Sequence, residues 1–97
     1  MNMQALMAQA RKLQNTLEKT TKEVEEKEFV YENDNIKLVM LGNNSLKSIK
    51  IKNGSLSNDL ELLEDVIVVG INDLTKQIRN EKDSKLGKYT NGFGGLF

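Results

Sequence analysis

The sequence predicts an α+β fold in which a long helix, a three-stranded antiparallel meander and a second long helix follow one another along the chain. Apolar residues recur every three or four positions over residues 1–28 and again over residues 58–85, which is the spacing of amphipathic helices. Between them, residues 29–52 hold three short runs of alternating apolar and polar residues, separated by turn sequences rich in Asn. Because the strands are consecutive, we expect both helices to lie on one face of the sheet.

The first predicted helix covers residues 1–28, which contain neither Pro nor Gly. We expect an apolar stripe along it to pack on the second helix of the same chain. A free-standing coiled coil is the alternative, although the stripe barely covers about four heptads. The stripe consists of Met3, Leu6, Ala10, Leu13, Leu17, Thr20 and Val24.

The three predicted strands are residues 29–32, 36–41 and 46–52. The second is apolar on both faces at its end, which indicates a central position. Gly42-Asn43-Asn44 tolerates the positive φ angles of a hairpin turn. In the third strand, Leu46 is out of phase with the inward Ile49 and Ile51, so we expect a β-bulge or a strand start next to it. Such strands span about 20–23 Å and the helices about 38 Å, so the helices must overhang the sheet.

The second predicted helix, residues 58–85, is apolar around more of its circumference than one partner can cover. It begins at Asn58, which is followed three residues later by Glu61 in the manner of an N-cap. The apolar arc is roughly 180–200° wide, whereas a simple surface helix needs about 100°. We expect a second copy of the chain to cover the surplus, so the sequence predicts a homodimer. The predicted interface residues are Leu62, Val66, Val69 and, beside them, Asp73.

A chain of 97 residues makes one domain, which we place at residues 1–86. We interpret residues 87–97 as a flexible tail rich in Gly and Phe. Three of its residues are large and apolar, namely Phe93, Leu96 and Phe97. The alternative to disorder is therefore that the tail docks on a groove or on a partner protein.

The absence of Cys and His limits the chemistry of the chain to carboxylates, amines and hydroxyls. Disulfides, thiolate nucleophiles, imidazole bases and zinc fingers are thereby excluded. Glu61 and Asp65 lie one helical turn apart, but a solvated first turn explains them better than a cation site. Residues 92–95 lack the flanking strand and helix of a phosphate loop. We therefore expect no enzyme activity, no cofactor, no metal and no membrane span, in a cytoplasmic protein.

The net charge is zero, but the charges alternate in blocks along the chain. Counting Lys and Arg against Asp and Glu gives +3 for residues 1–22, −5 for 23–34, +4 for 35–52, −5 for 53–75 and +3 for 76–97. In antiparallel helices the two outer positive blocks meet on the overhanging ends, and the acidic stretches 23–28 and 59–65 meet at the other end. Cations collected on one surface are what DNA phosphates require. The residues that we predict to bind DNA are Arg11, Lys12, Lys76, Arg79 and Lys82.

A second basic patch competes with the first, in a stretch without any acidic residue. Lysines on a sheet also prevent pairing between sheet edges, so this patch is our second choice. Because no aromatic residues interleave the lysines, a platform for single-stranded nucleic acid is not indicated. We expect contacts mainly to the duplex backbone, with weak sequence preference. The second patch consists of Lys37, Lys47, Lys50 and Lys52.

Residues 63–74, LEDVIVVGINDL, resemble the signature of the YbaB/EbfC family of bacterial nucleoid-associated proteins, in which an LED-hydrophobic run leads to an Asn-Asp pair. Residues 6–14, LMAQARKLQ, are similar to the family's Gln- and Met-rich opening. The chain departs from the family pattern in both strand turns and at Leu74, where Ala is common. The resemblance implies a tweezer-like homodimer, with paired sheets as its body and projecting helical arms, that binds duplex DNA.

The leading hypothesis is therefore a homodimeric nucleoid-associated protein of the cytoplasm. The alternative is a protein-interaction or adaptor module of the same fold with little or no DNA affinity, because the chain is neutral and its tail is apolar.

Overall fold

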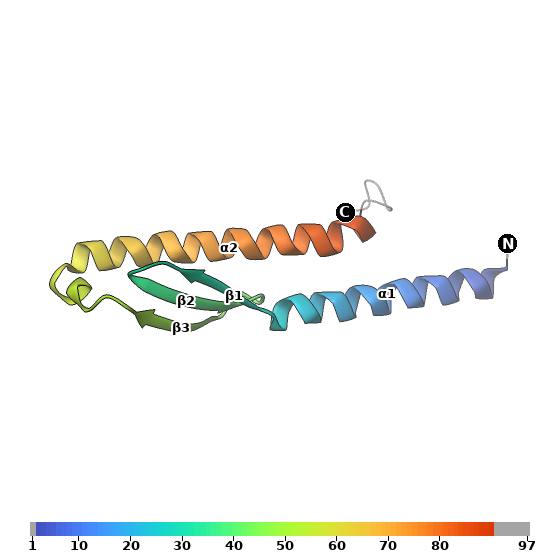
Figure 1. The fold of residues 1–97 in the computed structure, drawn as a ribbon. Coiled ribbons are helices and arrows are strands. Elements are labelled where there is room, and N and C mark those ends of the chain that lie inside the picture. The colour runs from blue at the N-terminus through green and yellow to red at the C-terminus, as the bar shows by residue number, and fades with distance from the viewer. Residues whose placement is uncertain (1, 91–97) are drawn as a thin grey trace.

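Both long helices extend past the same end of a small antiparallel sheet (Figure 1). The computed structural model describes residues 2–90, without the side chains of residues 88–90. The molecule is elongated and measures 69 × 23 × 15 Å along its principal axes. Its elements are, in order, α1 (Met3–Glu26), β1 (Glu28–Glu32), β2 (Ile36–Leu41), β3 (Leu46–Ile51), a 3₁₀ helix η1 (Gly54–Asn58) and α2 (Leu60–Thr90). This order confirms the predicted α+β fold, and the parts of α1 and α2 beyond the sheet are called the arms below.

β2 is the central strand, antiparallel to β1 on one side and to β3 on the other, as its apolar faces predicted. Leu38 of β2 pairs with Tyr31 of β1 and with Ile49 of β3. Directly paired residues point to the same face of a sheet, and α2 lies along this face (Figure 1). We call it the inner face.

The predicted irregularity near Leu46 is confirmed as a β-bulge. The register shifts between Val39 and Met40 of β2, so that Lys47 is the extra residue of β3. Leu46 consequently pairs with Met40 and shares the inner face with Ile49 and Ile51.

The hydrophobic core lies between α2 and the inner face of β1 and β2. Gly70 lets the helix approach the sheet closely, because a Cβ there would stand 2.4 Å from Leu38 Cδ1 and 2.8 Å from Tyr31 Cδ1. α2 does not extend over β3, whose six residues are all exposed. The buried core residues are Val24, Phe29, Ile36, Leu38, Met40, Leu74 and Ile78.

α1 packs on α2 only through its C-terminal half, so the expected packing of its stripe on the second helix is confirmed in part. Val24 is buried and Leu17 half-buried, whereas Met3 and Leu6 are exposed. The reason is that α1 enters β1 at the end of the sheet and points away from it (Figure 1). The β2–β3 turn holds this junction, since Gly42 N donates to Lys27 O at 3.0 Å.

Gly42 is needed for this close approach, since no side chain could fit. A Cβ on Gly42 would stand 1.7 Å from the carbonyl oxygen of Val24. The positive φ angle predicted for the turn belongs to Asn44, at 70°.

α2 begins and ends later than predicted. Residues 54–58 form η1, which buries Leu56, and the N-cap of α2 is therefore Asp59, whose Oδ1 accepts from Leu62 N at 3.1 Å. Asn58 does not cap the helix. The helix runs through Gly87 to Thr90, so the predicted tail boundary at residue 87 falls inside α2. A single Gly costs a helix only about 1 kcal/mol, which does not end it. The remainder of the predicted tail, residues 91–97, lies outside the described residues.

Candidate nucleic-acid interface

The predicted cations of α1 lie together on one side of its arm. Arg11, Lys12 and Lys19 line a shallow groove whose other residues, Ala8, Asn15 and Thr16, also belong to α1. All of the charged side chains of this groove are basic. An anion lying along the groove meets three positive charges at helical spacing, which suits the phosphates of a nucleic-acid backbone.

Two of the predicted cations of α2 lie in a second groove, between α2 and the β2–β3 turn. Arg79 and Lys82 line it with Asn44 and Asp83. Lys76 is placed differently, because the next residue, Gln77, donates from Nε2 to Val30 O at 3.2 Å and so holds this turn of α2 over the sheet. Lys76 is therefore not on an arm.

The structure does not bring the cations of α1 and α2 into one cluster. Lys27, just after α1, is bound to Glu81 of α2, with Nζ 2.5 Å from Oε2. At a rise of 1.5 Å per residue, Lys12 lies about 22 Å along α1 from Lys27. Lys82, in contrast, directly follows Glu81 and lies beside the Lys27–Glu81 contact. Four of the predicted DNA-binding cations thus form two separate groups within one chain, Arg11 with Lys12 and Arg79 with Lys82.

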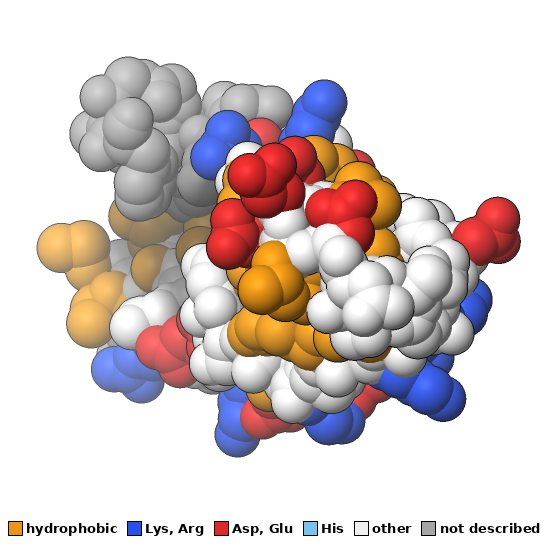
Figure 2. Space-filling view, turned by 90° about the vertical axis from the view of Figure 1, so that its left-hand side faces the viewer, with side chains coloured by type: hydrophobic (Ala, Val, Ile, Leu, Met, Phe, Trp, Pro, Cys, Tyr) orange, Lys and Arg blue, Asp and Glu red, His pale blue; other side chains and the backbone are white. Residues whose placement is uncertain are grey.

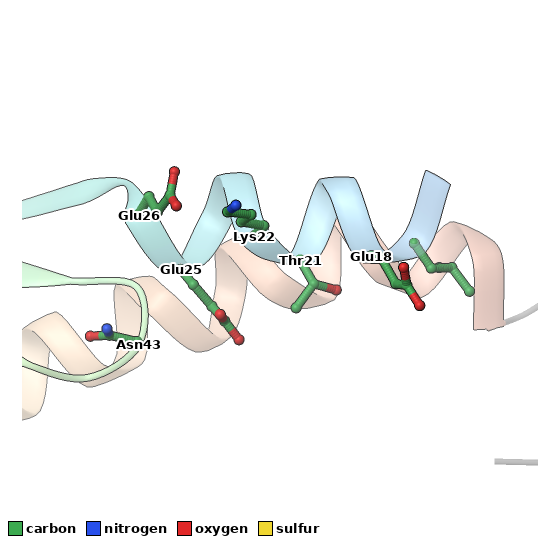
Figure 3. A pocket seen from close by; sticks show the side chains of 7 residues that line it. Glu18, Thr21, Lys22, Glu25, Glu26 and Asn43 are labelled. Atoms are coloured by element: carbon green, nitrogen blue, oxygen red, sulfur yellow. The ribbon is translucent and has the colours of Figure 1, made fainter. Parts of the chain in front are cut away.

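The acidic stretches do not meet either, contrary to the sequence-based expectation. Residues 23–28 lie at one end of the sheet and residues 59–65 at the opposite end of α2, because the whole sheet lies between them (Figure 1). Acidic side chains gather around an apolar patch at the end of the molecule where α2 begins (Figure 2). At the other acidic site, Glu18, Glu25 and Glu26 line a groove with Lys22 and Asn43, and its excess of carboxylates disfavours phosphate (Figure 3).

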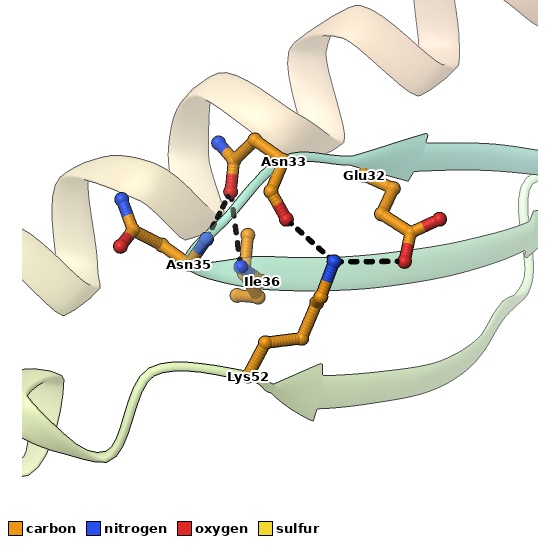
Figure 4. Close-up of polar contacts among 5 residues, drawn as sticks. All are labelled: Glu32, Asn33, Asn35, Ile36 and Lys52. Atoms are coloured by element: carbon orange, nitrogen blue, oxygen red, sulfur yellow. Dashed lines mark hydrogen bonds and ion pairs between the residues drawn. The ribbon is translucent and has the colours of Figure 1, made fainter.

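The second basic patch is partly neutralised by β1. Lys47 forms an ion pair with Glu28, and Lys52 Nζ lies 3.1 Å from Glu32 Oε2 and donates to Asn33 O at 3.0 Å (Figure 4). The hydrogen bond and the charge of Lys52 lower the pKa of Glu32 below its usual value. The patch therefore has less positive potential than its four lysines suggested, because counting along residues 35–52 omitted the acids of the neighbouring strand.

Two apolar surfaces are exposed in the single chain. The first contains the predicted dimer residues of α2: Leu62 is 43% and Val69 55% exposed, and Val66 is half-buried. Asp73 beside them does not need a partner from a second copy, because Gln77 Nε2 donates to its Oδ2 at 2.7 Å.

The second apolar surface was missed by sequence reasoning. It is the inner face of β3, where Leu46, Ile49 and Ile51 are 40%, 46% and 46% exposed. The alternation along β3 places Ile49 and Ile51 on one face, and the bulge brings Leu46 to the same face. Only the position of α2 shows that nothing in the described chain covers them.

No metal centre is formed within residues 2–90, where no group of three or more His, Cys, Asp or Glu could hold an ion. Over the same residues, neither helix is both long enough and apolar enough to cross a membrane.

Comparison with known proteins decides the family. The model of the YbaB/EbfC DNA-binding family matches residues 1–93. The chain belongs to this family. Among its relatives is a nucleoid-associated protein of Enterococcus faecalis, 33% identical over 98% of this chain and 94% of the relative. Nucleoid-associated proteins of Metamycoplasma arthritidis and Lactococcus lactis are each 36% identical, over 94% and 95% of this chain and 97% and 96% of the relative.

The match extends over α1, the sheet and all of α2. The resemblance seen in the LED motif and the first helix is therefore confirmed for the whole fold. As a YbaB/EbfC protein, the chain is a member of a family of nucleoid-associated DNA-binding proteins.

Proposed function

We propose that this protein binds duplex DNA in the bacterial nucleoid, as a homodimer and mainly through phosphate contacts. The observation that supports the proposal best is the groove on the arm of α1, whose charged side chains are all basic, in a chain of a DNA-binding family. The binding residues are Arg11 and Lys12 on α1 and Lys76, Arg79 and Lys82 on α2. Phosphate contacts carry no base information, so sequence preference is weak.

A homodimer supports this function because one chain presents its cations in two separate groups. A second copy doubles both groups and allows a duplex to be held between arms of different chains. The exposed Leu62 and Val69 supply an apolar surface that association would bury.

The test is a salt titration of duplex binding by the wild type and two matched double variants. Each phosphate contact contributes about 0.9 to the slope of log K against log salt. Arg79→Glu with Lys82→Glu removes two cations from each chain and four from a homodimer, so we expect the slope to fall by about 3.6 units. The control, Lys37→Glu with Lys50→Glu, makes the same charge change on the sheet and should leave the slope nearly unchanged. Equal losses in both variants would contradict the assignment of phosphate contacts to Arg79 and Lys82.

The alternative function is a protein-interaction module. It is favoured by the zero net charge and by the exposed apolar row of β3. Failure of the wild type to retain duplex DNA at about 50 mM salt would support this alternative and refute the proposal.

A further inference from the structure

The heptad repeat of α1 continues beyond the part of the helix that is covered within the chain. Its a and d positions, which we call the seam, are Met3, Leu6, Ala10, Leu13, Leu17, Thr20 and Val24. The last four are half-buried or buried in the single chain. The first three are exposed, with Met3 at 73% and Leu6 at 49%. The seam is therefore open over residues 3–10.

The positions that flank the open seam carry no charge. In a coiled coil these are positions e and g, whose charges select the partner and its orientation. From residue 2 to residue 16 they hold Asn2, Met7, Gln9, Gln14 and Thr16. A different partner chain finds no charge here by which to be selected. A second copy of α1 meets apolar and amide side chains like its own, without like-charge repulsion.

The position of α2 determines the direction from which a second copy can approach. α2 lies on the seam side of α1, because Val24 is buried in the same core as Ile78. The contact of Lys27 with Glu81 places these residues opposite each other along the two antiparallel helices. The described part of α2 ends nine residues after Glu81, about 14 Å further along, and so lies opposite the neighbourhood of Glu18.

A parallel copy would bring its own α2 into the space between the two α1 helices that the first α2 already fills. An antiparallel copy brings only the beginning of its α1 to the open seam. If the two helices overlap over residues 3–13, Asn2 of each lies opposite Gln14 of the other. The overlap then ends before the described part of α2 begins, so only the antiparallel arrangement fits.

We propose that the open seam of α1 pairs antiparallel with the open seam of a second copy that belongs to another dimer, so that two arms are joined end to end. Leu6 of one chain then faces Ala10 of the other. Met3 reaches the position opposite Leu13, where the cover within each chain begins. The pairing goes beyond the proposed function and does not require DNA.

The joined arms would present two basic grooves that face away from each other. The groove of Arg11, Lys12 and Lys19 lies on the other side of α1 from the seam and stays free. About two heptads are fewer than the 3–4 that sustain a coiled coil, so the pairing increases with local protein concentration. If the proposed function holds, dimers gathered on DNA therefore hold two duplexes together.

The first test uses the absence of Cys from the chain. Leu6→Cys and Ala10→Cys are prepared as separate proteins, one of them enlarged by a tag, and are mixed under mild oxidation. The control mixes Leu6→Cys with Ala8→Cys, because Ala8 is about 200° around the helix from Ala10. We expect the mixed disulfide of Leu6→Cys with Ala10→Cys to form about tenfold faster than the control, at a rate that rises with protein concentration.

Equal rates in the two mixtures would overturn the proposal, because an unpaired arm has no preferred side. Faster formation of the disulfide between two Leu6→Cys chains than of the mixed disulfide would also overturn it, since that product indicates a parallel pair.

The second test measures whether duplex DNA on beads retains a second, labelled duplex through the protein. Leu6→Gln should lower this retention about tenfold and leave the salt dependence of binding to a single duplex unchanged. The control Ala5→Gln alters an exposed residue away from the seam and should change neither. Binding of one duplex without retention of a second by the wild type would contradict the pairing of arms on DNA. If the wild type binds no duplex, the proposed function is wrong, and the disulfide rates still decide whether the arms pair.

Discussion

Lys27 is held by three parts of the fold at once. Its Nζ lies 2.5 Å from Glu81 Oε2 of α2 and 5.3 Å from the centre of the Phe29 ring, and its carbonyl accepts from Gly42 N. Because α1 has no other buried residue than Val24, these contacts fix the direction in which its arm projects.

We expect Glu81→Gln to lower the free energy of unfolding at neutral pH by about 0.5 kcal/mol, since the ion pair is partly exposed. The hydrogen bond from Lys27 lowers the pKa of Glu81 below its usual 4.5. A carboxylate with a lowered pKa stabilises the fold above its usual pKa and loses this effect as pH falls through the lowered value. Urea unfolding at about pH 7 and about pH 3 should therefore show a smaller loss in the variant than in the wild type.

A suitable control is Glu64→Gln, which alters an exposed glutamate of the same helix. It should keep the pH dependence of the wild type. If both variants lost the same amount of stability between the two pH values, the contact of Glu81 with Lys27 would not be the cause.

At the scale of elements, α2 contains two glycines with opposite surroundings. A Cβ on Gly70 meets Leu38 and Tyr31, whereas a Cβ on Gly87 meets nothing within 4 Å among the described residues. Gly→Ala in a helix interior gains about 1 kcal/mol, but overpacking a core costs about 1–3 kcal/mol. We expect Gly70→Ala to destabilise by about 1 kcal/mol net and Gly87→Ala to stabilise by about 0.5–1 kcal/mol. Thermal and urea unfolding measure the change in stability of both variants. Stabilisation by Gly70→Ala would contradict the prediction and show that α2 and the sheet can move apart at Gly70.

The elements were largely predictable because periodicity records which face of each element is buried. The bulge beside Leu46 was visible in the phase of the apolar residues along β3. The role of Gly42 could not be predicted, because it depends on a contact with the carbonyl of Val24. Val24 belongs to α1, and only the folded structure brings it next to Gly42. The cap of α2 was misplaced by one residue because a polar run containing Asn58 and Asp59 offers two candidates, and only η1 decides between them.

The candidate interface was less predictable than the elements. The groove of Arg11 and Lys12 depends on spacing within one helix, which the sequence contains. Periodicity shows which face of a helix is buried but not how far the helix is shifted along its axis. The relative position of α1 and α2 along their axes therefore could not be predicted. The ion pair of Lys52 with Glu32 was accessible in principle from the two strand registers. One pairs Glu32 with Lys37, and the other pairs Lys37 with Lys50, which brings Lys52 to the same end of the sheet.

At the scale of the whole molecule, the proposed homodimer has two candidate surfaces. One is the side of α2 with Leu62, Val66 and Val69, and the other is the uncovered inner face of β3. Val68 and Val69 are 57% and 55% exposed but lie about 100° apart around α2. Val69 is on the first side. Val68 is on the side of β3, since Thr75, two turns further on, lines a groove with Asn44 of the β2–β3 turn.

These two valines distinguish the surfaces by the same substitution. Both are exposed, so introducing Glu should change the stability of the single chain by no more than about 0.5 kcal/mol. If the dimer forms through Leu62, Val66 and Val69, Val69→Glu buries an unpaired charge in the interface and weakens association by 10-fold or more, on the order of 1.4 kcal/mol or above. Val68→Glu leaves it intact. Sedimentation at about 20 µM protein, with circular dichroism to confirm folding, measures the result. Dissociation by Val68→Glu alone would transfer the interface to β3, and a monomeric wild type would refute the homodimer.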